Sequence, residues 1–374
     1  MVLNSIVSSP NTIHLDRMMQ TKLGQANLIS PAPSGLSNEW KQWIASNKLR
    51  QLPDGYLVDI LVQRGVDIRM AVAEVKAVSN HPYFQAAAAM LAEQTQQAQA
   101  QIATQAIQVE KLETQLDIYR QLEKLAPNYN QIQRVDSLSR TEFYENYFTQ
   151  NTPVILTGIM GNWQALSRWN PQYLKQEYGE VEVEVQFNRE SNPLFEREKE
   201  KHRQQMTMGD YVDLIVKGGK TNDYYMVPFN GNFDSPELKP LLKDVEIFSE
   251  YIDPSNQKAC IFFWFGPEGT ITPLHHDPCN VLLSQVYGKK RIRLISPNQK
   301  ALLYNQVGVY SEVDLLNPDY EKYPRFKDVE IIEVILEPGE VIFLPVGWWH
   351  HVEALDISIS VSFTNFWVTN YYNI

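Results

Sequence analysis

The second half of this sequence consists of short runs of apolar and β-branched residues, separated by glycine and proline. Runs with the composition of strands occupy residues 259–265, 271–277, 281–287, 290–295, 331–336, 341–344 and 357–363. Short strands with turn residues between them indicate a sandwich or a barrel. A jelly-roll barrel presents inward-facing side chains from several strands to one cavity. We therefore predict a mainly β fold with flanking helices, built on a double-stranded β-helix of the jelly-roll type.

Histidine is concentrated at two points of this region. Four of the seven histidines lie in two dipeptides, His275-His276 and His350-His351. His275 and Asp277 are two residues apart in a strand-like run, so their side chains leave the same face of a sheet. His276 points to the opposite face, which makes His275 the better partner for Asp277.

His350 offers a third ligand, because it follows one strand-like run and precedes another. His351 is excluded less firmly, since the chain can turn after Trp349. Two imidazoles and one carboxylate at three corners of a metal leave other positions open, as in non-haem Fe(II) oxygenases. An open site of this kind can bind a cosubstrate and O2.

Two other interpretations of these residues stay open. A zinc hydrolase is the nearest alternative, because zinc also takes His and Asp ligands and a catalytic zinc also keeps an open position. An H-x-D tripeptide by itself would be typical of a solvated strand end. The third ligand at a plausible strand position favours a metal site, but the residues do not choose between metals.

Composition and charge restrict the partners and the compartment. The formal net charge is -11, which disfavours broad electrostatic attraction to nucleic acid or to an anionic membrane. No apolar run reaches the length of a membrane span, and residues 1–27 lack the pattern of a secretory signal. Two cysteines, Cys260 and Cys279, make no disulfide framework and suit a reducing compartment. We expect a cytoplasmic protein with no membrane partner.

The N-terminal third is predicted to be helical. Residues 1–36 show no sustained periodicity and are left unassigned as irregular chain. Helical patterns with capping residues then occupy 37–49, 54–62 and 67–78. Together with the long helix that follows, they form a predicted helical module over residues 37–126.

The long helix is predicted over residues 81–126, with Pro82 at an early helical position and Pro127 as the stop. Apolar residues recur at three- and four-residue steps along its second half, which is a heptad pattern: Ala98, Ile102, Val109, Leu112, Leu116 and Tyr119. This seam would either pack on its own domain or join two subunits as a coiled coil. A spacer rich in Ala and Gln is a third possibility.

Residues 127–374 are predicted to form a second domain that leads into the barrel. Aromatic and β-branched residues increase here, and glycine and proline become more frequent. Residues 128–136 are interpreted as a linker, and 190–203 as a charged, solvated loop or a substrate-facing lid. Helices are expected over 137–146, 161–169 and 208–216, and strands over 152–158, 181–187 and 223–227.

Four ordered segments resemble a known family: WFGPEGTITPLHHDP, QVYGKKRIRLISP, LEPGEVIFLPVGWWHHV and ISISVSF. They are similar to the JmjC-type cupins, and especially to the small hydroxylase branch. That branch includes the asparaginyl hydroxylase that inhibits hypoxia-inducible factor and the JmjC arginyl hydroxylase. The resemblance runs from about Asn128 to the C-terminus and leaves out the N-terminal third. It implies a JmjC-like cupin oxygenase domain over 127–374.

The resemblance also implies roles for individual residues. His275, Asp277 and His350 correspond to the family's catalytic iron ligands. Lys290, fifteen residues after His275, matches the lysine that pairs with the distal carboxylate of 2-oxoglutarate. A buried cation is also what electrostatics requires opposite a carboxylate in a closed cavity.

Three further positions match residues around the cosubstrate. Thr272 matches a hydroxyl residue that donates to the same carboxylate. Tyr225 matches a tyrosine on the cavity wall, and Tyr224 would replace it if the register differed by one residue. Asn280 resembles an asparagine near the cosubstrate, but it lies five residues after His275, where the relatives have six.

The activity implied by the resemblance is that of an Fe(II)- and 2-oxoglutarate-dependent oxygenase, which uses O2 and releases succinate and CO2. A protein or peptide side chain is the expected substrate, by analogy with the family. N-methyl-lysine demethylation and RNA-base hydroxylation are alternatives of the same chemistry. A non-catalytic cupin sensor, or an adaptor that works through the helical third, are alternatives of other classes. A homodimer through the long helix is one assembly that the heptad pattern allows, beside a helix packed on its own domain.

Overall fold

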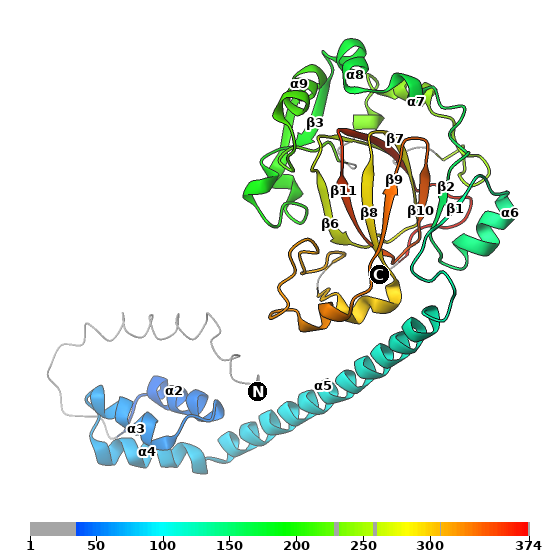
Figure 1. Cartoon of the computed structure of the whole chain (residues 1–374). Helices are drawn as coiled ribbons and strands as arrows, with labels where there is room; N and C mark the ends of the chain where they lie inside the picture. Colours follow the sequence, from blue (N-terminus) through cyan, green and yellow to red (C-terminus); the bar gives the residue numbers. More distant parts are fainter. Residues whose placement is uncertain (1–34, 228–231, 257–259, 307, 373–374) are drawn as a thin grey trace. The chain divides into compact units, whose positions relative to one another are not determined.

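The computed structural model describes residues 35–227, 232–256, 260–306 and 308–372. Residues 1–34 of the predicted irregular segment therefore lie outside the described part. The chain divides into two compact units, Met1–Gln108 and Val109–Ile374. The division falls inside the long helix α5, Pro82–Glu123 (Figure 1).

The N-terminal unit contains the three predicted short helices. They are α2 (Asn38–Leu49), α3 (Asp54–Gln63) and α4 (Ile68–Asn80). The side chains of Ser37 and Asp67 accept hydrogen bonds from backbone N–H groups of the first turns of α2 and α4, as N-caps do. The helices enclose a small apolar core: Ile44, Leu57, Leu61, Ala71 and Val75.

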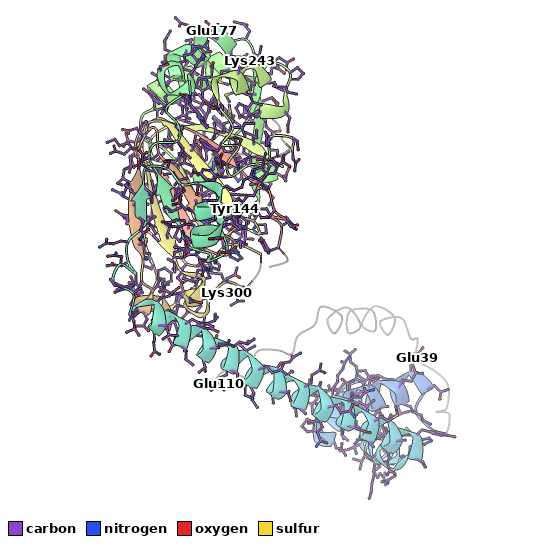
Figure 2. All side chains as sticks on the ribbon, turned by 90° about the vertical axis from the view of Figure 1, so that its right-hand side faces the viewer. Glu39, Glu110, Tyr144, Glu177, Lys243 and Lys300 are labelled. Atoms are coloured by element: carbon purple, nitrogen blue, oxygen red, sulfur yellow. The ribbon has the colours of Figure 1, made fainter. Side chains whose placement is uncertain are left out.

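Helix α5 begins at Pro82, as the sequence predicts, and buries none of its residues. The seam residues Ile102 and Leu112 are 65% and 61% exposed. Figure 2 shows side chains projecting from this helix around Glu110. The helix therefore does not pack this part of its seam on its own domain, and the coiled coil stays a prediction.

The second unit is built on two facing sheets (Figure 1). The larger sheet has the order β1 (Gln133–Val135), β2 (Val154–Leu156), β10 (Val341–Leu344), β7 (Val281–Tyr287), β12 (Ser358–Phe363), β5 (Ile261–Gly266). The smaller sheet has the order β6 (Ile271–His275), β11 (Trp349–Ala354), β8 (Lys290–Ile295), β9 (Ile332–Leu336). One apolar cluster joins Leu283 and Ile342 of the larger sheet to Ile292 and Val352 of the smaller one. The interior of the predicted jelly-roll barrel is therefore a packed core between the two sheets.

Aromatic side chains bury the outer face of the larger sheet. Phe263, Phe343 and Phe363 belong to one large cluster with residues of the preceding helices. These helices are α6 (Arg140–Phe143), α7 (Ala165–Arg168), α8 (Pro171–Tyr178) and α9 (Met208–Gly218). A two-stranded sheet of β3 (Glu182–Gln186) and β4 (Arg203–Thr207) accompanies them. The region before the barrel and the barrel itself therefore share one hydrophobic core.

Several local predictions were wrong. The predicted linker 128–136 contains β1, which pairs in parallel with β2. The predicted strand 223–227 makes only isolated bridges, at Tyr225 and Met226. Strands β4 and β11 and helix α8 were not expected at all. Strand β11 was missed because both of its faces are buried, so WHHVEA lacks the alternation that marks a half-exposed strand.

Among the described residues, no helix combines the length and the apolar character that crossing a membrane would require.

Candidate metal centre

Two neighbouring strands bring the three predicted metal ligands together. Strands β6 and β11 are antiparallel, and His275 lies opposite His350 in their register. Asp277 follows the last residue of β6 by two positions. One ligand atom from each of the three residues lies within 4.8 Å of the others. Positions far apart in the sequence therefore offer their ligand atoms at one point.

The carboxylate of Asp277 lies close to Nε2 of both imidazole rings. Its Oδ1 is 3.9 Å from Nε2 of His275, and its Oδ2 is 3.5 Å from Nε2 of His350. Ligands at about 2.1 Å from a metal and at right angles to each other are ~3 Å apart. A small closure would therefore bring all three atoms onto one ion.

Backbone carbonyls fix the tautomer of both histidines. Nδ1 of His275 is 2.8 Å from the carbonyl oxygen of Pro273, and Nδ1 of His350 is 3.0 Å from that of Trp348. A carbonyl oxygen only accepts, so each Nδ1 must carry the hydrogen and donate it. In the neutral imidazole, Nε2 is then the nitrogen with the lone pair, and each Nε2 lies on the side of Asp277, as metal ligation requires.

Burial keeps His350 neutral. Burial, helped by the neighbouring His275, lowers the pKa of His350 to about 4. A neutral imidazole is the form that binds a metal ion, so no proton has to be displaced near neutral pH. The donor set, the tautomers and the protonation state of His350 all fit a divalent transition metal.

The second histidine of each pair lies outside the triad. The ring of His276 stands edge-on to Trp349 at a centroid distance of 4.4 Å. Nδ1 of His351 is 3.4 Å from a guanidinium nitrogen of Arg293. The alternation of side chains along a strand predicted His275, and not His276, as the ligand. The structure places these two histidines in the same way.

Lys290 is a buried cation without a carboxylate. Its side chain is 2% exposed, and Nζ donates to the hydroxyl of Tyr225 at 3.3 Å. No acidic residue of the described chain forms an ion pair with it. Burial lowers the pKa of Lys290 to about 7. The interior of the barrel therefore contains an amine that is only partly protonated near neutral pH and that has no acidic partner among the described residues.

The structure places Tyr225, and not Tyr224, beside Lys290. The hydroxyl of Tyr224 lies against Gly218, and its ring is 5.4 Å from that of Phe187. Of the two tyrosines between which the sequence did not decide, Tyr225 is therefore the one beside Lys290.

Thr272 faces the barrel interior because strand β6 contains a bulge. Thr272 and His275 are three residues apart, so strict alternation would put them on opposite faces. The register pairs His350 with His275 but Val352 with Thr272, so three residues of β6 oppose two of β11. A bulge re-aims the following side chain. Thr272 thus shares the side of Val352, a residue of the inner core.

Asn280 is buried, and its side-chain amide is already bonded to other parts of the protein. Its Nδ2 donates to Oδ1 of Asn370 at 2.8 Å, and its Oδ1 accepts from the backbone N–H of Val346 at 2.9 Å. The predicted contact between Asn280 and a cosubstrate stays a prediction, although its amide is engaged elsewhere.

Sequence reasoning missed a second buried cation, Arg189. Its side chain is fully buried and pairs with Glu196 at 2.6 Å. It also donates to the carbonyl of Ile271 at 2.9 Å, and its Cζ lies 5.2 Å from the ring centroid of Tyr225. Segment 190–203 is therefore not a freely solvated loop, because Glu196 fastens it to the barrel. A charged stretch gives no sequence signal for which of its charges are buried.

Tyr310 was also missed. Its ring stacks on that of His275 at a centroid distance of 5.6 Å, and the two residues form a β-bridge. Tyr310 lies in the long segment between β8 and β9, where no periodic pattern indicated contact with the site. Burial raises the pKa of its hydroxyl, so this ring is a neutral wall beside the metal ligand.

The family of the chain follows from a comparison with protein-family models. Residues 140–372 match the model of the cupin-like domain. The chain therefore belongs to the cupin-like family. Together with the triad, this membership confirms the predicted class, a JmjC-type cupin with Fe(II), 2-oxoglutarate and O2 as its cofactors.

The chain is also similar to several curated proteins. Lysine-specific demethylase 8 of Xenopus tropicalis is 33% identical over 236 residues, which are 60% of this chain and 50% of the relative. Lysine-specific demethylase JMJ30 of Arabidopsis thaliana is 32% identical over 243 residues, 62% of this chain and 54% of the relative. JmjC domain-containing protein E of Dictyostelium discoideum is 25% identical over 324 residues, 69% of this chain and 90% of the relative. The chain spans about half the length of the first two.

The histidine pairs supply a matched test of the metal centre. We expect His350→Ala to weaken Mn(II) binding by more than about 100-fold, since it removes a ligand rather than a neighbour of one. His351→Ala, a change of the same size at the next residue, should leave the affinity unchanged. Free Mn(II) in an anaerobic titration, followed by electron paramagnetic resonance, measures both. Equal losses in the two variants would contradict the assignment.

Proposed function

We propose that this protein is an Fe(II)- and 2-oxoglutarate-dependent oxygenase that hydroxylates a C–H bond of a protein side chain, with release of succinate and CO2. The observation that carries the proposal is that one barrel presents both a His–Asp–His triad with free Nε2 atoms and a buried, unpaired Lys290. A metal site alone would not require the lysine. A dicarboxylate bound to the metal at one end would require it at the other.

The spacing of the two groups suits such a ligand. His350 and Ala354 are four residues apart on β11, which is ~13 Å along a strand. Lys290 lies opposite Ala354 in the neighbouring strand. A five-carbon dicarboxylate together with the lysine side chain can cover this distance. We infer that the first carboxylate faces the triad and the second faces Lys290.

In this proposal, His275, Asp277 and His350 hold the metal and leave its remaining positions open. The metal and the 2-oxo acid, when bound, supply the oxidising chemistry that breaks the C–H bond. Lys290 neutralises the distal carboxylate, and Tyr225, whose hydroxyl already accepts from Lys290, keeps its own hydrogen free to donate to that carboxylate. Thr272 is proposed to donate from β6, and Trp264, near Lys290, to exclude water.

Two substrate chemistries are compatible with this site. Hydroxylation of a protein side chain and demethylation of N-methyl-lysine both begin with hydrogen abstraction from a carbon. We place hydroxylation first, by analogy with the resembling hydroxylases, and keep demethylation as the alternative because two relatives carry that name. RNA-base hydroxylation ranks lower because the chain is acidic. A purely non-catalytic sensor would have no need for both the triad and Lys290.

The proposal is tested in two steps. Anaerobic addition of Fe(II) and 2-oxoglutarate should produce a visible metal-to-ligand charge-transfer band, which Asp277→Ala should abolish. Peptides and metabolites are then screened in air for stimulated succinate formation. Mass spectrometry distinguishes the gain of one oxygen from the loss of a methyl group. Substrate-stimulated succinate formation by Asp277→Ala would show that the proposal is wrong.

Lys290 gives the proposal a pH dependence. Its pKa in the free protein is about 7 because of burial, and a bound carboxylate raises it by favouring the ammonium form. Above the free value, binding must therefore take up a proton. We expect the affinity of the Mn(II)-loaded protein for 2-oxoglutarate to be constant below this pH and to fall above it by up to about tenfold per pH unit.

Calorimetric titration at pH values on both sides of the free pKa measures this dependence. Lys290→Arg is the matched control, because arginine stays charged throughout this range. Its affinity for 2-oxoglutarate should not change across the range, whatever its absolute value. A wild-type affinity without slope would contradict the assignment of Lys290.

We also propose that residues 37–126 form a helical domain and that this domain makes a homodimer through α5. The exposed seam residues Ile102 and Leu112 support it, since apolar side chains at heptad positions are stabilised by a partner helix. Light scattering should give a dimer mass for the wild type and a monomer mass for Leu112→Glu.

We also propose a cytoplasmic location, which Cys260 and Cys279, both free thiols, support.

A further inference from the structure

The loop that carries Asp277 and the loop that precedes His350 are joined to each other. Asp277 lies in the loop between β6 and β7, and His350 follows the loop between β10 and β11. The N–H of Gly347 donates to the carbonyl of Asp277 at 3.3 Å. The N–H of Val346 donates to Oδ1 of Asn280 at 2.9 Å. The geometry of the triad therefore depends on how these loops are held.

One C-terminal residue, Asn370, bonds to Asn280 in both directions. Oδ1 of Asn370 accepts from the backbone N–H and from Nδ2 of Asn280, each at 2.8 Å. Nδ2 of Asn370 donates to the carbonyl of Asn280 at 2.9 Å and to that of Thr364 at 2.7 Å. Both amide hydrogens and the amide oxygen of Asn370 are thus used. A further bond joins the N–H of Tyr372 to the carbonyl of Pro278 at 2.9 Å.

The loop needs this support because regular structure does not provide it. Residues 276–280 belong to no strand, and the side chain of Asp277 is 33% exposed. Asn280, by contrast, is 1% exposed. A loop with a buried amide that is bonded through both Nδ2 and Oδ1 at one end, and a strand at the other, has little freedom to move the carboxylate between them.

We propose that Asn370 is a positioning residue of the metal centre. Acting through Asn280, it holds the loop that carries Asp277 and joins it to the loop that leads to His350. Asn280 then serves the centre through the loop, in place of the predicted contact with the cosubstrate. The inference rests on the metal site of the proposed function.

The test measures metal affinity, which does not depend on turnover. We expect Asn370→Ala to weaken Mn(II) binding by about tenfold or more, as loss of an outer partner of a metal ligand does. Asn280→Ala should weaken it at least as much. The double variant should lose less affinity than the two single losses combined, because both substitutions remove the bond between Nδ2 of Asn280 and Oδ1 of Asn370.

Asn365→Ala is the matched control. Asn365 lies in the same C-terminal segment and is 3% exposed, but its amide donates to the carbonyl of Asp253 at 2.8 Å, away from the metal loop. This variant should lower the thermal transition and leave the Mn(II) affinity unchanged. Equal weakening by Asn365→Ala and Asn370→Ala would overturn the proposal, because the effect would then be general destabilisation.

If Asn370→Ala does not fold, Asn370→Asp is measured in the same way. It keeps the acceptor for Asn280 and loses the two donors, so weaker Mn(II) binding is again expected. Wild-type affinity in a folded Asn370 variant would overturn the inference while leaving the metal site intact, provided that Asp277→Ala abolishes binding. Absence of Mn(II) binding by the wild type would overturn the proposed function itself.

Discussion

The antiparallel pairing of β6 with β11 is the interaction on which the site depends. It sets His275 opposite His350, and the next residues along β11 set the place of Lys290 through β8. A shift of this register by one residue would turn every side chain of a strand to the other face. The triad and Lys290 are therefore positioned by the backbone hydrogen bonds of β11, to β6 on one side and to β8 on the other, and the core between the sheets holds these pairings in place.

Burial has different electrostatic effects at the triad and at Lys290. At the triad, burial keeps His350 neutral and backbone carbonyls direct its lone pair. At Lys290, burial disfavours the ammonium form and lowers the pKa to about 7, and in the proposed function a bound carboxylate restores the charge. Burial thus acts on both His350 and Lys290, the two ends of the proposed site.

Much of this could be predicted from the sequence, for identifiable reasons. The alternation of His275 and Asp277, the turn residues between strands and the segments that resemble the JmjC-type cupins all depend on local patterns. Contacts made across the fold had no such pattern. Nothing in the sequence near Arg189 indicates that it is buried beside Tyr225, and nothing near Asn370 indicates that it meets Asn280. Strand β11 was missed because two buried faces hide the strand periodicity.

Strand β6 is at the margin of its sheet, with a neighbour on one side only. On its other side, side chains and loop backbone make the hydrogen bonds that a neighbouring strand would make. Asn222 accepts from the N–H of Ile271 and Arg189 donates to its carbonyl, while the backbone around Tyr310 bonds to Leu274 and His276. An unprotected margin of this kind invites pairing with another chain. The residues that surround the site thus also guard the protein against aggregation, so a change that loosens them would threaten solubility as well as catalysis.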